Sequence, residues 1–402
     1  MSSSLLSSID RVHEGAPHRV KDKEKALLYR EICIGETPTR LALSRRLKIR
    51  PSSVSEAVQE LVDDGLIFET NAPLRSKLGR PQIILSARPD RYVAISIYID
   101  SRELKGVLVT LREDVIAEEV RVLPQETGNR AMTAAIRSLL TRLRERIPRG
   151  AELAGAVLCL VGTVNAHTRT WTNAARWPRL LNLNLSTLAA KLDFPLIIRR
   201  TNDAELEYFL DCNPSTRSTS ALLLHWGFGI GSAVAFRGTL LTSSLGRFGE
   251  IGHTPSRYAS DVPCLCGSRG CLETVAALWS LLPVLKARLG TVPEDEKELA
   301  PLLGDAGLLR VPEIRTALRA VQDALLVLSM MFYPDRIILS GPFTENPPVF
   351  RRLTEGLRRA LPEYARDASS FAVIPGGMPG CRRGGASPLF RATLARALRR
   401  ST

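Results

Sequence analysis

Three cysteines and a histidine stand close together in the second half of the chain. Cys264, Cys266 and Cys271 fall within eight residues, with glycines between them, and His253 precedes Cys264 by eleven residues. Three thiolates and an imidazole form the closed tetrahedral donor set of structural zinc sites, and thiolates disfavour magnesium and calcium. The alternative is three buried or redox-active thiols beside an unrelated histidine. The spacing favours a structural Zn²⁺ ion held by these four side chains.

The remaining cysteines and the N-terminal residues favour a cytoplasmic protein. The chain has seven cysteines, and an odd number without an export signal argues against a disulfide framework. The N-terminus has no basic start, and its apolar run is too short for a signal peptide. No stretch approaches the roughly 20 apolar residues of a membrane helix. We therefore expect no membrane insertion.

The net charge of +14 favours polyanionic partners but does not locate them. The chain of 402 residues has 55 basic and 41 acidic residues, and 45% of its residues are hydrophobic. This composition excludes disordered and collagen-like chains, and at roughly 100–200 residues per domain the length predicts two or three domains. Residues 1–91 hold 16 basic and 12 acidic residues, whereas residues 351–402 hold 11 arginines and 3 acidic residues. The excess of positive charge is therefore not confined to one candidate DNA-binding segment.

Three helices are predicted near the N-terminus, after a Ser-rich, unpatterned segment (residues 1–20) that predicts a flexible tail. Apolar residues recur at helical spacing over residues 21–34. Thr37 is the expected cap of a second helix. A third helix begins at Pro51, which suits a first helical position, and runs to about Asp64.

A hairpin is predicted after these helices. Short apolar strands at residues 66–69 and 82–85 flank a polar, basic stretch. Three helices followed by a hairpin form a winged helix-turn-helix. We therefore predict a DNA-binding domain over residues 21–88.

The third helix is the predicted recognition helix. Serine and glutamine side chains on its outer face can bond to base edges or phosphates in the major groove, and flanking basic residues suit phosphates. Basic residues of the hairpin reach the DNA backbone or a narrow minor groove. The alternative is a small protein-interaction domain with a solvated basic face. The candidate DNA-contacting residues are Arg45, Arg46, Lys48, Arg50, Ser52, Ser53, Ser55, Gln59, Arg75, Lys77 and Arg80.

From residue 92 onward the pattern alternates between strands and helices. Strands are predicted at residues 92–99, 104–111, 115–123, 153–162, 196–200, 221–226, 233–241 and 336–340. Helices are predicted at residues 130–147, 204–211, 274–289 and 311–333. Two mixed halves, each opening with strands, predict an α/β domain over residues 92–402, with a cleft between two lobes that divide near residue 203.

Several motifs occur together with the winged helix. They are Leu78-Gly-Arg-Pro81, Thr201-Asn-Asp-Ala204, Gly227-Phe-Gly-Ile-Gly231, Gly249-Glu-Ile-Gly-His253 and the Cys-x-Cys-Gly-x-x-Gly-Cys-x-Glu signature that ends at Glu273. From Lys21 to the C-terminus the chain resembles the ROK family of sugar-responsive repressors and sugar kinases. It is most similar to the repressor branch, which includes N-acetylglucosamine and xylose repressors. The resemblance implies an actin-like, ribonuclease H-like ATPase fold of two lobes, with a sugar in the cleft and a homodimeric or homotetrameric assembly.

The resemblance also implies a set of sugar-binding residues. Asn202 and Asp203 match the family's Asn-Asp pair, whose Asp is the catalytic base in kinase members. Carboxylates and an amide can bind neighbouring sugar hydroxyls in pairs. The alternative is that Asn202 and Asp203 cap a helix and that Glu250 is a surface acid. The implied positions are Asn202, Asp203, Glu250, His253, Glu273, Gly162, Thr172 and Asn173.

The nucleotide-binding motifs of the family are altered. Kinase members begin the domain with Asp-x-Gly-Gly-Thr, whose glycines let backbone N–H groups approach phosphate. The corresponding residues are Tyr98-Ile99-Asp100-Ser101-Arg102, and a later glycine pair reads Ser340-Gly341. The loop at residues 227–231 keeps its glycines but has Phe228 where Thr is usual. The resemblance therefore predicts a protein without kinase activity and with no catalytic residues.

Together these features predict a DNA-binding transcriptional regulator, a repressor of carbohydrate genes, whose affinity for its operator is controlled by a sugar or sugar derivative. One alternative is an ATP-dependent sugar kinase with an appended DNA-binding domain. A second alternative is a regulator controlled by a protein partner.

Overall fold

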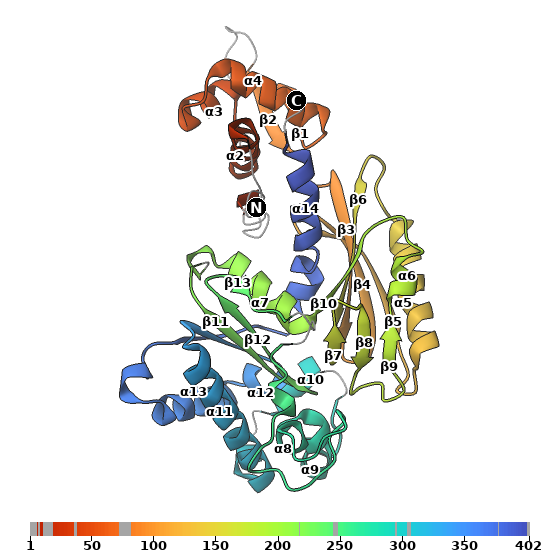
Figure 1. The fold of residues 1–402 in the computed structure, drawn as a ribbon, viewed down its shortest axis with the longest axis vertical. Coiled ribbons are helices and arrows are strands. Elements are labelled where there is room, and N and C mark those ends of the chain that lie inside the picture. Colours follow the sequence, from red (N-terminus) through yellow and green to blue (C-terminus); the bar gives the residue numbers. More distant parts are fainter. Residues whose placement is uncertain are drawn as a thin grey trace.

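The computed structural model describes residues 6, 9–10, 19–35, 38–71, 82–216, 218–243, 248–293, 296–303, 307–376 and 378–399. They form an N-terminal helical module above two five-stranded sheets (Figure 1). Both sheets have the same plan, because three parallel strands are followed by two antiparallel ones in each. The predicted α/β class with an N-terminal winged helix-turn-helix is confirmed.

The N-terminal module has the predicted order of elements. It consists of α2 (Val20–Ile34), α3 (Arg40–Leu47), α4 (Pro51–Asp63), β1 (Ile67–Asn71) and β2 (Ile83–Ala87). The strands pair antiparallel. The predicted cap of the second helix is wrong, because the side chain of Thr39 accepts the N–H of Ala42, and Thr37 lies outside the described residues. Within the predicted tail, Ile9 is buried and Asp10 pairs with Arg30 at 2.7 Å.

The first sheet has the order β10-β6-β3-β4-β5. Its strands are β3 (Tyr92–Asp100), β4 (Glu103–Thr110), β5 (Val115–Val122), β6 (Glu152–Leu160) and β10 (Leu196–Arg200). Alternate residues of β3 pack on opposite sides, with Ile95 and Ile97 in the cluster that holds α5 (Asn129–Arg144) and Ala94 and Tyr98 in another cluster. Because both faces are covered, the central strand reads as a continuous apolar run.

The second sheet has the order β13-β12-β11-β14-β15. Its strands are β11 (Ala221–Trp226), β12 (Ile230–Phe236), β13 (Thr239–Leu240), β14 (Arg336–Ser340) and β15 (Ser370–Val373). One face packs on a helical layer, which contains α8 (Glu273–Ala276), α9 (Leu278–Leu289), α10 (Glu296–Leu302), α11 (Pro312–Phe332), α12 (Pro342–Glu345) and α13 (Pro347–Ala360). The other face packs on α7 (Thr201–Cys212), which also contacts β6 and β10 of the first sheet. Helix α7 therefore lies between the two sheets.

Two predicted elements are divided in the structure. The predicted strand over residues 233–241 is a hairpin, because Arg237 and Gly238 both have positive φ and turn the chain between β12 and β13. The predicted helix over residues 274–289 is interrupted at Ala277, whose backbone is extended. Helix α8 is therefore a single short turn beside the cysteine loop.

Several short elements are absent from the sequence-based prediction. The β7 (Thr163–Asn165), β8 (Thr170–Asn173) and β9 (Leu181–Asn184) strands form a third sheet, followed by α6 (Ser186–Ala189). The single-turn helices are η1 (Pro214–Thr216), η2 (Ile251–His253), η3 (Leu308–Arg310) and η4 (Glu363–Ala365). Among the described residues, no helix combines the length and the apolar character needed to cross a membrane.

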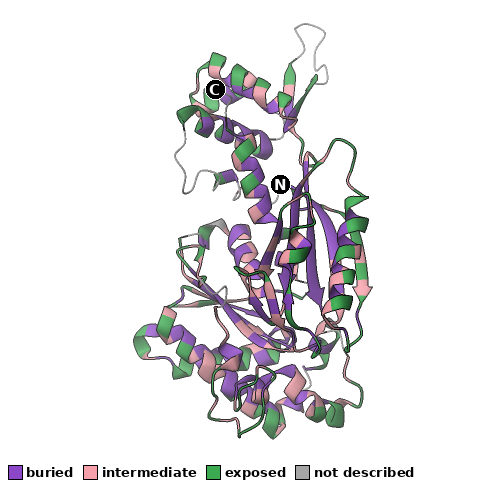
Figure 2. Ribbon diagram, turned by 45° about the vertical axis from the view of Figure 1, so that its right-hand side comes forward, coloured by how far each residue is buried: buried purple, intermediate pink, exposed green. Residues whose placement is uncertain are grey.

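The C-terminal segment joins the sheets to the N-terminal module. The π-helical turn η5 (Gly380–Gly384) contacts α7 and β3, and α14 (Ser387–Ala397) packs along β3 and β6 (Figure 1). Leu394 and Leu398 belong to the same buried cluster as Leu28 and Leu61 of the N-terminal helices. Figure 2 shows that buried residues continue from the first sheet into the N-terminal module.

A buried lysine strengthens this junction. The ammonium group of Lys25 contacts carboxylate oxygens of Asp64 at 2.8 Å and Glu60 at 3.2 Å, and it donates to the carbonyl oxygen of Arg399 at 3.4 Å. Its side chain is 2% exposed. A buried cation needs compensating partners. Because one partner of Lys25 is the carbonyl oxygen of Arg399, this contact connects helix α2 to the segment after α14.

Replacement of Glu205 tests how the C-terminal segment is held. The buried Glu205 carboxylate accepts the backbone N–H groups of Gly380 at 3.0 Å and Cys381 at 2.9 Å. Burial raises the pKa of Glu205, and these two bonds oppose the rise. Glu205→Ala leaves two buried donors without their acceptor, so we expect a loss of about 2 kcal/mol or more in unfolding free energy, measured by urea denaturation. An equal loss in Glu363→Ala, at an exposed position, would contradict this assignment.

Candidate functional site

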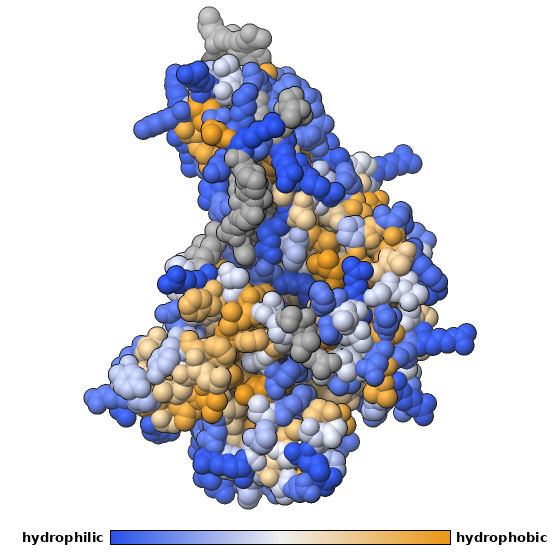
Figure 3. All heavy atoms as spheres, viewed as in Figure 1, coloured by the Kyte–Doolittle hydropathy of each residue, from blue (hydrophilic) through white to orange (hydrophobic). Residues whose placement is uncertain are grey.

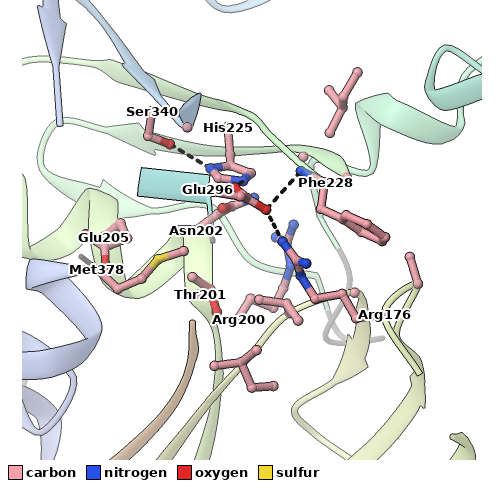
Figure 4. Close-up of a pocket in the computed structure, with 18 of the residues that line it drawn as sticks. Arg176, Arg200, Thr201, Asn202, Glu205, His225, Phe228, Glu296, Ser340 and Met378 are labelled. Atoms are coloured by element: carbon pink, nitrogen blue, oxygen red, sulfur yellow. Dashed lines mark hydrogen bonds and ion pairs between the residues drawn. The ribbon is translucent and has the colours of Figure 1, made fainter. Parts of the chain in front are cut away.

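A cavity lies where the edges of the two sheets meet around α7. The first sheet provides the end of β3 and the turn after β6, and the second provides the loop between β11 and β12 and the end of β14. The first turn of α7 forms the part of the wall between them. Figure 4 shows labelled side chains of α7, of β11 and the loop after it, and of the end of β14 around this cavity. The cavity matches the cleft predicted between two lobes.

Arg200 organises two of the predicted sugar-binding acids. Its guanidinium group lies 3.3 Å from an oxygen of Asp203 and 3.6 Å from an oxygen of Glu250, and it donates to the carbonyl of Ser232 at 3.1 Å. The Arg200 side chain is 7% exposed. Burial raises the pKa of Asp203, while Arg200 and Arg199 oppose that rise. Arg200 therefore positions both carboxylates and favours their ionised forms.

The predicted sugar-binding residues do not all line the cavity. Its lining includes Asn202, Glu250, His253, Glu273, Gly162 and Asn173. Asp203 and Thr172 are not among the lining residues. Asp203 instead faces Arg200, and Thr172 lies in β8 beside the lining residue Asn173. The six lining residues lie in α7, in β8, in the turn after β6, and in the segments at η2 and α8, so the structure brings them together from distant parts of the chain.

Glu273 is held by the glycine-rich loop. One carboxylate oxygen accepts the backbone N–H of Ile230 at 2.7 Å, and the other accepts the indole N–H of Trp279 at 3.3 Å. A Cβ atom at Gly229 would stand 2.9 Å from the first oxygen. The loop therefore needs glycine here, because any side chain would push Glu273 out of its position.

The cysteine cluster adjoins the cavity. The ligand atoms of His253, Cys264, Cys266 and Cys271 all lie within 4.8 Å of one another, so the group could hold a metal ion. His253 and Cys266 also line the cavity. Burial and the neighbouring thiols raise the pKa of Cys271 to about 12, so this thiol stays protonated at neutral pH unless a cation compensates the thiolate. The donor set therefore fits a thiolate-binding metal.

Residues 98–102, which the family resemblance predicts to correspond to a phosphate loop, make contacts within the protein. Tyr98 is buried at 2% exposure within β3. The carboxylate of Asp100 pairs with the ammonium of Lys105 at 2.9 Å. Ser101 has a positive φ of 56° and accepts the backbone N–H of Glu296 at 3.3 Å. The hydroxyl of Ser101 thus contacts the opposite side of the cleft.

Sequence reasoning missed a group of charged residues that also line the cavity. The carboxylate of Glu296 contacts the guanidinium group of Arg176 and accepts the backbone N–H of Phe228 at 3.2 Å (Figure 4). The imidazole of His225 lies 3.9 Å from Glu296 and 3.1 Å from the hydroxyl of Ser340. Phe228 and Ser340 belong to motifs identified in the sequence, but Arg176, His225 and Glu296 belong to none, and Arg176 and Glu296 are 120 residues apart. Only the folded chain places them in one site.

Most of the predicted DNA-contacting residues that the structure describes are exposed on the N-terminal module. Ser52, Ser55 and Gln59 are exposed on α4, whereas Val54 and Val58 are buried. Ser53 is half-buried, and Arg45, Lys48 and Arg50 are exposed. Arg46 pairs with Glu31 at 2.9 Å, and Gln59 donates to Asp63 at 2.9 Å. Arg75, Lys77 and Arg80 lie outside the described residues.

The chain is similar to known regulators over most of its length. It is 23% identical over 371 residues to the DNA-binding transcriptional repressor Mlc of Escherichia coli (strain K12), covering 87% of this chain and 89% of the relative. It is 24% identical over 370 residues to the xylose repressor of Bacillus subtilis (strain 168), covering 89% and 91% of the two chains.

Solved structures show the same fold. A crystal structure of a ROK family transcriptional regulator homologous to E. coli Mlc has a TM-score of 0.71 at 20% identity, covering 94% of this chain and 99% of that chain. A ROK family glucokinase from Streptomyces griseus has a TM-score of 0.58 at 18% identity, covering 74% of this chain and 98% of that chain. The ROK family model matches residues 94–375. The chain belongs to the ROK family.

Proposed function

We propose that this chain is a DNA-binding transcriptional regulator, a repressor of carbohydrate genes, whose operator affinity is controlled by a sugar bound between the two sheets. The observation that carries the proposal is the continuous core from the cavity-bearing domain through α14 into the winged helix. Relatives named as repressors match the chain over both parts. We take residues 21–88 as the DNA-binding domain and residues 92–402 as the ligand-binding domain.

The DNA interface is the outer face of the winged helix. Exposed serines and Gln59 of α4 suit base edges, and Arg45, Lys48 and Arg50 suit phosphates. Arg46 must leave Glu31, and Gln59 must leave Asp63, before either can reach DNA.

The proposed assembly is a dimer or tetramer, which would present two such helices to two half-sites. Exposed Val327 and Met331, four residues apart on α11, offer apolar surface for assembly, and Figure 3 shows apolar residues gathered over the second sheet and its helices.

The sugar site consists of the hydroxyl-binding side chains around α7. Asn202, Glu250, His253 and Glu273 supply acceptors and an amide donor for neighbouring hydroxyl groups. Asp203 acts through Arg200, which it shares with Glu250. The C-terminal segment offers the route to DNA, because Met378 lines the cavity and the chain continues into η5 and α14. A ligand that binds one arrangement of the lobes better shifts the population toward that arrangement.

The kinase alternative requires ATP at the altered loop formed by residues 98–102. Asp100 places a carboxylate where the family has glycine, and its Lys105 partner offsets that charge only in part. The relatives named as repressors also favour a regulator over an enzyme. Calorimetry distinguishes the two, since sugar binding without ATP binding fits a regulator and phosphate transfer from ATP would require an enzyme.

The metal we propose is structural Zn²⁺, held by His253, Cys264, Cys266 and Cys271. Four protein ligands leave no open position, so the ion would order the loop and provide no catalytic chemistry. His253 would connect the metal to the cavity that it also lines.

Salt-dependent DNA binding tests the interface. On an operator selected from random-sequence DNA, Arg45→Ala and Arg50→Ala should each weaken binding to all sequences and lower the salt dependence by about one phosphate contact. Gln59→Ala should instead relax the preference at one base pair. Exposed Arg351 in α13 provides the matched control. A similar loss of affinity in Arg351→Ala would contradict the assigned face.

Operator release tests the sugar site. Glu250→Ala should keep the affinity for the operator but lose release by the effective sugar, because the variant removes a hydroxyl acceptor from the cavity wall. Release is measured by fluorescence anisotropy of labelled operator, with Glu363→Ala as the control. Unchanged release in Glu250→Ala would show that the sugar binds elsewhere.

Metal content tests the zinc assignment. Purified protein should contain close to one zinc per chain, and Cys266→Ser should lose the metal and some thermal stability because one thiolate is missing. Cys212→Ser, outside the cluster, should keep the zinc content. Full zinc occupancy in Cys266→Ser would remove Cys266 from the ligand set.

A further inference from the structure

One end of the cavity is built to hold an anion, and a side chain of the protein occupies it. Arg176, His225 and the backbone N–H of Phe228 surround the carboxylate of Glu296 (Figure 4). The hydroxyl of Ser101 accepts the backbone N–H of the same residue, and we call these four groups the anion corner. The guanidinium carbon of Arg176 also lies 4.1 Å from the centroid of the Phe228 ring. The carboxylate therefore sits against the retained glycine-rich loop, where backbone N–H groups favour negative charge.

The local backbone is shaped to admit this carboxylate. A Cβ atom at Gly227 would stand 2.5 Å from an oxygen of Glu296 and 2.6 Å from the imidazole of His225. The Arg176 side chain is 8% exposed, and the Glu296 side chain is 17% exposed. Burial lowers the pKa of His225, so the positive charge at this corner comes from Arg176. A largely buried guanidinium group needs an anion beside it at all times.

We propose that the anion corner binds the phosphate group of a phosphorylated sugar, which takes the place of the Glu296 carboxylate. This inference rests on the proposed function, because it takes the effector to be a sugar. The corner and the hydroxyl-binding residues Asn202 and Glu250 line the same cavity, so one ligand can reach both. A phosphate offers three acceptor oxygens to the guanidinium, hydroxyl and backbone donors, whereas a carboxylate offers two.

The exchange also changes how the two lobes are joined. Arg176 lies between β8 and β9, beside the first sheet, whereas Glu296 begins α10 in the helical layer of the second sheet. Three contacts among the described residues cross the cleft here. They are the Arg176–Glu296 pair, the bond from the N–H of Glu296 to the hydroxyl of Ser101, and the contact of the Arg176 guanidinium group with the Phe228 ring. A phosphate that displaces Glu296 keeps Arg176 paired but releases the carboxylate contact between the lobes. Binding thereby favours a different arrangement of the lobes.

Thermal unfolding with inorganic phosphate as the probe tests the corner without knowledge of the sugar. In zinc-loaded full-length protein, Glu296→Ala should lower the Tm, and phosphate should restore it with an apparent affinity at least about tenfold tighter than for the wild type. Potassium chloride at equal ionic strength should not restore it. Exposed Glu298, two residues along α10, provides the control Glu298→Ala. The double variant Arg176→Ala/Glu296→Ala should lose the rescue by phosphate.

Absence of rescue in Glu296→Ala, or equal rescue in the double variant, would overturn the proposal. If Glu296→Ala fails to fold, Glu296→Gln gives the same comparison, because the amide keeps the shape but loses the charge.

Calorimetry with paired ligands then identifies the source of the phosphate. Glucose and N-acetylglucosamine are each compared with their 6-phosphates, with ATP as a separate titration. At least one 6-phosphate should bind at least about tenfold tighter than its neutral sugar, and Arg176→Ala should remove that preference. ATP binding to the corner with no preference for either 6-phosphate would overturn the proposal in favour of a nucleotide site.

The two hypotheses fail in different ways. If a neutral sugar releases the operator, and if this release is unaltered in Glu296→Ala, the proposed regulator is retained and the phosphate site is rejected. If phosphate restores the Tm of Glu296→Ala but the protein binds no operator, the phosphate site is retained and the proposed regulator is rejected.

Discussion

The structure depends on the bond between one buried carboxylate and the C-terminal segment. Strand β15 belongs to the second sheet, whereas α14 packs on the first, so the residues between them must cross from one sheet to the other. Glu205 of α7 fixes that crossing by accepting two backbone N–H groups of η5. Because α7 contacts both sheets and α14 shares a core with the N-terminal helices, this segment links the two sheets to the N-terminal module.

Pairing of charges is the second constraint on the site. Several acids of the site form ion pairs with basic side chains. The pairs are Arg200 with Asp203 and Glu250, Arg176 with Glu296, and Lys105 with Asp100. Each acid can be placed in a largely buried cleft only because a cation offsets part of its cost of desolvation. The pairs made by Arg200 hold Asp203 and Glu250 in position, which reduces the ordering that ligand binding requires. A neutral sugar can hydrogen-bond to such acids without breaking the pairs.

Local sequence patterns predicted the elements whose residues share one kind of environment along their whole length. The central strands are covered on both faces, so their continuous apolar runs identified them, and the cysteine cluster is local enough for its spacing to predict a common site. The hairpin was missed because two residues with positive φ, Arg237 and Gly238, interrupt an otherwise regular strand pattern. The break at Ala277 was missed because one residue with an extended backbone interrupts an otherwise regular helical pattern. Arg176, His225 and Glu296 could not be found at all, since their relation exists only after both sheets have formed.

A filled anion corner suits a sensor better than an enzyme. A phosphotransferase must present donors to the charge that develops during transfer, and a resident carboxylate would compete for those donors. A sensor needs only a ligand that binds one state more tightly than another. In the proposed sensor, an internal carboxylate would set the threshold of the response, because the ligand would bind only to molecules in which Glu296 has left its Arg176 partner. The strength of that single ion pair would therefore tune the effector concentration to which the protein responds, without any change in the residues that recognise the sugar.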